Sequence, residues 1–217
     1  MSSAEEALQH LTQRMYAEVA TMMCDAEMQS VVTDGLTVLY GPPMVRPDIG
    51  IITFQGGGAD KSVQASAPKR LLYRDDPYKF GTALRRYMSA VGLSDTLANR
   101  TVAQAVVFPQ APTSQAGAWM AKKGPKARWR EFSKRWTERL VEAQRPKVVL
   151  VFGEKASAVL GIEWREIERK HKQNHMTFAQ ADWREIPAVF CHHLSIGCPE
   201  SEAIRCMGEV KVLIDRR

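Results

Sequence analysis

Polar residues capable of chemistry follow the apolar runs of this sequence, at the points where the runs end. The runs are rich in β-branched residues and cover residues 49–54, 102–108, 147–152 and 187–191. Runs that are apolar on both faces are typical of buried parallel strands. The carboxyl ends of such strands line the ligand crevice of an open α/β sheet. The sequence therefore predicts one cleft, built from three loops that carry Gln55, Gln110 and His193.

The loop after the first run contains a triple glycine, residues 56–58, directly behind Gln55. Glycines let backbone N–H groups approach a ligand closely. Two common phosphate-binding motifs are excluded, because Asp60 stands where the P-loop needs glycine and Lys61 where the last glycine of G-x-G-x-x-G should be. A flexible turn after a strand is the other interpretation of this loop.

His193 is the titratable residue best placed for chemistry. A histidine at a strand end can donate a hydrogen bond, act as a general acid or ligate a metal, and it can also be a purely structural residue. Cys191, Cys198 and Cys206 lie close to it in sequence and raise the alternative of zinc. The chain contains no C-x-x-C pair and no H-E-x-x-H motif, so we expect no metal and no cofactor.

Helical periodicity separates the apolar runs. It covers residues 3–30, 79–91, 128–143, 154–160 and 200–214, and a short strand is expected at residues 37–40. Ser3 is the expected N-cap of the first helix, with Glu6 at capping-box spacing. Strands that alternate with helices predict an α/β fold with a parallel sheet. The length predicts one domain over residues 1–217, in which residues 1–35 form an N-terminal helical segment.

The charge is unevenly distributed along the 217 residues. Residues 1–50 carry two basic and seven acidic residues, whereas the remainder carries 28 basic and 17 acidic ones, and the net charge is +6. A basic body favours an anionic partner, nucleic acid first, although solubility alone is a sufficient explanation. Phosphate contacts are easiest to arrange in the loop before the helix at 128–143, which contains Lys122, Lys123 and Lys126.

The sequence gives no sign of a membrane or of an oxidising compartment. No apolar run approaches 18 residues, and the start MSSAEEALQH lacks a basic n-region and an apolar h-region. The four cysteines are expected to be free thiols. We therefore expect a cytoplasmic monomer without membrane contact.

Five segments, taken together and in order, carry a family resemblance. Residues 38–58 look like an entry strand and first active-site loop, 77–93 like a P-F-x-G helix, 102–112 like a strand with a Pro-rich loop, 146–160 like a P-x-x-V-x-x-L-G element, and His193-Leu194-Ser195 like an H-P-S motif. In this order they resemble the uracil-DNA glycosylase superfamily, particularly its bacterial branches with a G-E-A-P-G-like first motif. The resemblance implies a three-layer α/β/α fold with a central, mostly parallel four-stranded sheet.

The resemblance also implies a site for base excision from DNA. Gln55 would lie in the water-positioning loop, with Gly56 and Gly57 beside the flipped base. Tyr78 or Phe80 would stack on that base.

Three further roles follow at the later motifs. Gln104 would stand near the polar base-reading position. His193 would stabilise negative charge on the departing base. Ser195 would contact a DNA phosphate, and Ile196 or a neighbour would fill the vacated stack.

The chain departs from the family pattern in the first motif. Gly56 and Gly57 stand where the family has Asp, Asn or Ala followed by Pro, so Asp60 is the nearest carboxylate that could orient water. Leu194 replaces the proline of the last motif.

We expect a DNA repair glycosylase that excises uracil or hypoxanthine. The alternative is a member of the same superfamily that binds DNA or a nucleotide without cleavage. A further alternative is an unrelated α/β enzyme that acts on a small molecule.

Overall fold

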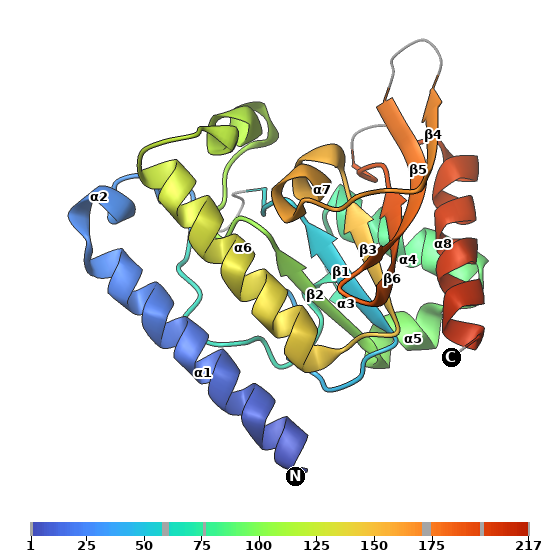
Figure 1. The fold of residues 1–217 in the computed structure, drawn as a ribbon, viewed down its shortest axis with the longest axis horizontal. Coiled ribbons are helices and arrows are strands. Elements are labelled where there is room, and N and C mark those ends of the chain that lie inside the picture. The colour runs from blue at the N-terminus through green and yellow to red at the C-terminus, as the bar shows by residue number, and fades with distance from the viewer. Residues whose placement is uncertain (1, 58–60, 76, 171–174, 196–197, 217) are drawn as a thin grey trace.

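A computed structural model describes residues 2–57, 61–75, 77–170, 175–195 and 198–216. Its centre is a six-stranded sheet with the strand order β2-β1-β3-β6-β5-β4 (Figure 1). The strands are β1 (Ile49–Thr53), β2 (Thr101–Ala105), β3 (Val148–Phe152), β4 (Glu166–Lys170), β5 (His175–Trp183) and β6 (Ile186–Cys191). The protein is thus an α/β protein with a mostly parallel sheet.

The four apolar runs form the parallel part of this sheet. β1 pairs with β2 on one side and β3 on the other, and β3 pairs with β6, all in parallel. β1, β2 and β3 are buried at every position, which explains why their sequences are apolar on both faces.

The expected sheet of four strands is wrong, because β5 and β4 extend it as antiparallel strands beyond β6. The expected strand at residues 37–40 is also wrong: in the described part of the chain this segment contributes only isolated bridges from Leu36 and Leu39.

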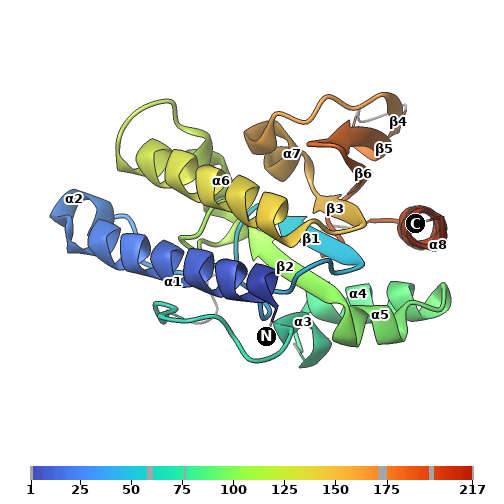
Figure 2. The ribbon, with the colours of Figure 1, turned by 60° about the horizontal axis from the view of Figure 1, so that its bottom comes forward.

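Helices lie on both faces of the sheet (Figure 2). They are α1 (Ser3–Cys24), α2 (Ala26–Gln29), α3 (Leu72–Asp75), α4 (Lys79–Ala90), α5 (Ser94–Asn99), the 3₁₀ helix η1 (Thr113–Met120), α6 (Pro125–Gln144), α7 (Glu154–Leu160) and α8 (Glu200–Asp215). One hydrophobic cluster joins α1, α6 and α7 to the sheet, and a second joins α4, α5 and α8 to its other face. Among the described residues, no helix has the length and apolar character needed to cross a membrane.

The N-terminal helical segment differs in detail from the expectation. The N-cap is Ser2 with Glu5 in a complete capping box, one residue before the expected pair. The helix does not run to residue 30, because Asp25 has extended backbone and its carboxylate accepts hydrogen bonds from the N–H groups of Glu27 and Met28. Asp25 therefore ends α1 and caps α2.

Candidate functional site

A pocket of about 970 Å³ lies at the carboxyl ends of the parallel strands. Its lining residues follow β1, β3 and β6, and further ones come from the start of α4 and from the segment after β2. This is the place where an open α/β sheet binds ligands. Of the residues singled out in the sequence, the pocket brings together Gln55, Gly56, Gly57, Tyr78, Phe80, Gln110, His193 and Ser195.

The loop after β1 is tied to the segment that follows β2. Gln55 Nε2 donates to the carbonyl oxygen of Ala111 at 3.0 Å, and the Ala111 N–H donates back to the carbonyl oxygen of Gly56 at 3.2 Å. Gln55 Oε1 and Thr53 Oγ1 are buried and have no hydrogen-bond partner among the described residues. These bonds hold the first glycine of the loop in a fixed position on the pocket wall.

Gly56 has no space for a side chain. A β-carbon built on Gly56 would lie 2.5 Å from Tyr40 Oη and 3.0 Å from Gln110 Cγ, whereas one built on Gly57 would have no atom within 4 Å. Gln110 is itself held by a bond from its Nε2 to Thr37 Oγ1. A side chain at position 56 would thus collide with the Tyr40 hydroxyl and the Gln110 side chain.

The glycine loop carries two backbone N–H groups without a described acceptor at the pocket. The N–H groups of Gly56 and Gly57 make no hydrogen bond to any residue in the described ranges, and both residues line the pocket. Two successive N–H groups without acceptors can bind a carbonyl oxygen or an anion.

Aromatic rings form a wall of the pocket. The Phe80 ring lies 5.0 Å from the rings of Tyr73 and Phe152 and 5.1 Å from the ring of His193. Tyr78, at the rim, is 58% exposed. Phe80 and Tyr78 therefore differ: Phe80 is an interior ring beside His193, and Tyr78 is a surface ring that could stack on a ligand at the entrance.

His193 is largely enclosed in this wall, and its Nδ1 lies 2.8 Å from Ser195 Oγ. Burial, with a smaller contribution from His192, lowers the pKa of His193 to about 4. The imidazole is therefore neutral at physiological pH. A neutral ring that accepts the Ser195 hydroxyl proton at Nδ1 carries its own proton on Nε2 and can donate it in a hydrogen bond.

The rim of the pocket is charged, with basic groups in the majority. Lys79 and Lys155 are exposed and form no ion pair with any residue that the structure describes. Arg70 pairs with Asp75 at 2.9 Å, and Glu154 Oε1 accepts a hydrogen bond from the Met176 N–H. The two lysines are the rim groups that remain available to an anion.

Gln104 does not line the pocket. It is 3% exposed, and its Nε2 donates to the carbonyl oxygen of Thr137 in α6. Gln110, six residues later, stands at the pocket instead. The position of Gln110 after a strand end agrees with the pocket, whereas Gln104, expected from the family resemblance, lies inside β2.

The basic residues around α6 are also outside the pocket. Lys122 and Lys123 are exposed, and Lys126 lies 5.5 Å from the centre of the Trp119 ring. Asp60 and Ile196 lie outside the described residues. In the parts of the chain that are described, no group of three or more His, Cys, Asp and Glu residues could hold a metal ion.

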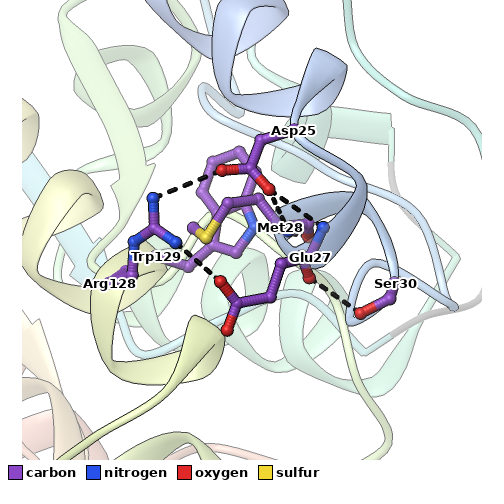
Figure 3. Close-up of polar contacts among 6 residues, drawn as sticks. All are labelled: Asp25, Glu27, Met28, Ser30, Arg128 and Trp129. Atoms are coloured by element: carbon purple, nitrogen blue, oxygen red, sulfur yellow. Dashed lines mark hydrogen bonds and ion pairs between the residues drawn. The ribbon is translucent and has the colours of Figure 1, made fainter.

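Arg128 of α6 is paired with the acidic N-terminal segment (Figure 3). Arg128 donates to Glu27 at 2.9 Å and to Asp25 at 3.3 Å. Beside this pair, the indole Nε1 of Trp129 donates to the carbonyl oxygen of Met28 at 2.9 Å. Acidic residues of the N-terminal segment and a basic residue of α6 thus help to join α2 to α6.

No protein-family model matches this chain, and no curated protein matches it either.

Proposed function

We propose that this protein is a DNA glycosylase-like enzyme that flips a deaminated base, uracil or hypoxanthine, out of DNA and cleaves its N-glycosidic bond. The proposal includes a uracil-DNA glycosylase-like three-layer fold, in which the parallel strands β2, β1, β3 and β6 correspond to the family's sheet. The observation that carries it is the neutral His193 in the pocket, packed beside Phe80 and bonded to Ser195.

The chemistry of the reaction suits this arrangement. Cleavage of an N-glycosidic bond leaves an oxocarbenium-like sugar and an anionic base, so a donor fixed near the base stabilises the transition state more than the substrate. The Nε2–H of a neutral His193 would be such a donor. The Gly56 and Gly57 N–H groups would contribute further donors to the base carbonyl oxygens.

The remaining pocket groups fit a flipped base. Phe80 or Tyr78 would stack on its face, and the Gln110 side chain would read its edge in place of Gln104. Lys79 and Lys155 at the rim would contact phosphates, with Lys122, Lys123 and Lys126 as an extension of the same footprint. Stacking surfaces and a basic rim are what base flipping needs.

The test is an excision assay on oligonucleotides that contain one uracil, hypoxanthine or xanthine, followed by alkaline cleavage of the abasic product. We expect cleavage of at least one of the three substrates and none of an undamaged control. A protein that binds the same oligonucleotides and cleaves none of them would contradict the enzymatic proposal.

A second candidate is a related protein that binds DNA or a nucleotide without cleaving it. Gly56 favours this candidate, because no side chain can stand at the position that orients water in many family members. It predicts salt-sensitive DNA binding with no abasic product in the same assay.

A further inference from the structure

Leu72 places an apolar side chain at the mouth of the pocket. It lines the pocket and is 40% exposed, whereas its neighbours Leu71 and Tyr73 are buried. Tyr78, also a lining residue, is 58% exposed. A residue that lines a cavity and is open to solvent stands at its entrance. Within the described ranges, two of the four exposed large hydrophobic residues are therefore at this entrance.

The short helix α3, which begins at Leu72, is held firmly against the pocket wall. The Leu72 N–H donates to the carbonyl oxygen of Tyr40 at 2.6 Å. The Tyr73 ring stacks on the Tyr40 ring with the centroids 5.1 Å apart. Arg85 Nη1 of α4 donates to the Tyr73 carbonyl oxygen at 2.7 Å. The backbone of Leu72 is thus fixed before any partner binds, which lowers the entropic cost of binding.

Cations accompany this apolar entrance. Arg70 and Arg74 both pair with Asp75, at 2.9 and 3.9 Å, so two cations share one carboxylate. Lys79, which also lines the pocket, forms no ion pair with any described residue. Residues 70–79 contain three basic and two acidic residues. Apolar side chains at a charged rim mark an interaction site, and their mixture with cations fits a partner that combines stacked bases with phosphates.

We propose that Leu72 is a wedge that enters the base stack of duplex DNA when the target base is flipped into the pocket. This role rests on the function proposed above. A flipped base leaves a gap in the stack, and an apolar side chain that fills the gap offsets the lost stacking and blocks the return of the base. Ile196, which the family resemblance suggested for this role, lies outside the described residues.

The test compares single-turnover excision from duplex and from single-stranded oligonucleotides that carry the same deaminated base. A wedge acts only where a base pair and its stack must be opened, whereas a structural role of Leu72 would affect both substrates. We expect Leu72→Ala to slow excision from the duplex about 10- to 100-fold and to change excision from the single strand less than about twofold. Leu72→Met, with an apolar side chain of similar size, should retain the duplex rate.

Val212→Ala is the matched control, because Val212 is 39% exposed on α8 and does not line the pocket. It should leave both rates at the wild-type value, and far-ultraviolet circular dichroism checks that each variant is folded. Equal slowing of both substrates by Leu72→Ala, or no slowing of either, would overturn the wedge.

Base flipping is measured separately from cleavage by the fluorescence of 2-aminopurine placed next to the target base in the duplex. The wild type should raise this fluorescence, because flipping unstacks the neighbouring base, and Leu72→Ala should reduce the rise. A rise that Leu72→Ala reduces, without an abasic product, would contradict excision and support the wedge. No rise with the wild type at any protein concentration would overturn the wedge itself.

Discussion

At the scale of single residues, Gly56 is constrained by its neighbours and not by its backbone. Its φ is not in the left-handed region that favours glycine, yet the Tyr40 hydroxyl occupies the place of a side chain. The sequence indicated a glycine loop at this strand end, but not its contact with Tyr40, which depends on the packing of a segment outside the sheet. Motif patterns report which residues are near one another in the chain and do not report such contacts.

A substitution series tests this packing. Gly56→Ala should destabilise the protein by about 1–3 kcal/mol, the usual cost of overpacking, because its methyl group meets Tyr40 Oη. Tyr40→Phe removes that atom, so the double variant should recover part of the loss. Gly57→Ala, with open space around it, is the matched control. Urea unfolding measures all four; equal destabilisation at positions 56 and 57 would show that the contact is not the cause.

His193 should make stability depend on pH. Its pKa of about 4 in the folded protein lies below the value of about 6.5 expected for an unfolded chain. As pH falls from 6.5 towards 4, the unfolded state takes up a proton that the folded state does not, so stability falls, by up to about 3 kcal/mol. Below pH 4 this contribution no longer changes.

Urea unfolding between pH 4 and 7.5 measures the effect. His193→Asn should have a shallower decline than the wild type, and His10→Asn, at an exposed site on α1, should retain the wild-type decline. Parallel curves for the wild type and His193→Asn would mean that His193 titrates normally.

At the scale of elements, the buried parts of the fold could be predicted from the sequence. The apolar runs at 49–54, 102–108, 147–152 and 187–191 are strands, and Gly161 ends α7 in the left-handed conformation. The antiparallel strands β4 and β5 could not be predicted in this way. Residues 166–170 read Glu-Ile-Glu-Arg-Lys, and such a charged edge strand has no apolar run to identify it.

The docking of α2 onto α6 should depend on Trp129 far more than on Arg128 (Figure 3). Trp129 is fully buried and donates to the Met28 carbonyl oxygen, so Trp129→Phe should cost about 2–4 kcal/mol through a lost buried bond and a smaller ring. The Arg128 ion pairs are half exposed, so Arg128→Gln should cost less than about 1 kcal/mol. Denaturant midpoints compare the two; a larger loss in Arg128→Gln would reverse this ranking.

Over the whole molecule, the net charge of +6 does not by itself identify a binding face for an anionic partner. Arg128 and Arg135 of α6 are engaged by Asp25, Glu27 and Glu18 of the N-terminal segment. The uneven charge along the sequence was visible from composition, but its partial cancellation by helix docking was not. The basic groups nearest the pocket are instead Lys79 and Lys155.

Salt dependence separates these surfaces. Lys79→Gln/Lys155→Gln should weaken DNA binding and reduce the slope of log affinity against log salt by about 1–2, because each phosphate contact contributes about 0.9. Lys134→Gln/Lys211→Gln removes the same net charge from lysines paired with Glu138 and Asp215, and should leave the slope unchanged. The same reduction in both double variants would indicate non-specific attraction.

The role that we propose for His193 is to stabilise the departing base in an excision reaction. The test measures single-turnover excision of the most rapidly excised deaminated base, by the wild type and by His193→Asn at saturating enzyme. We expect a rate about 10²–10³ lower for His193→Asn, with DNA affinity unchanged and with His10→Asn equal to the wild type. Excision by His193→Asn at the wild-type rate would contradict it.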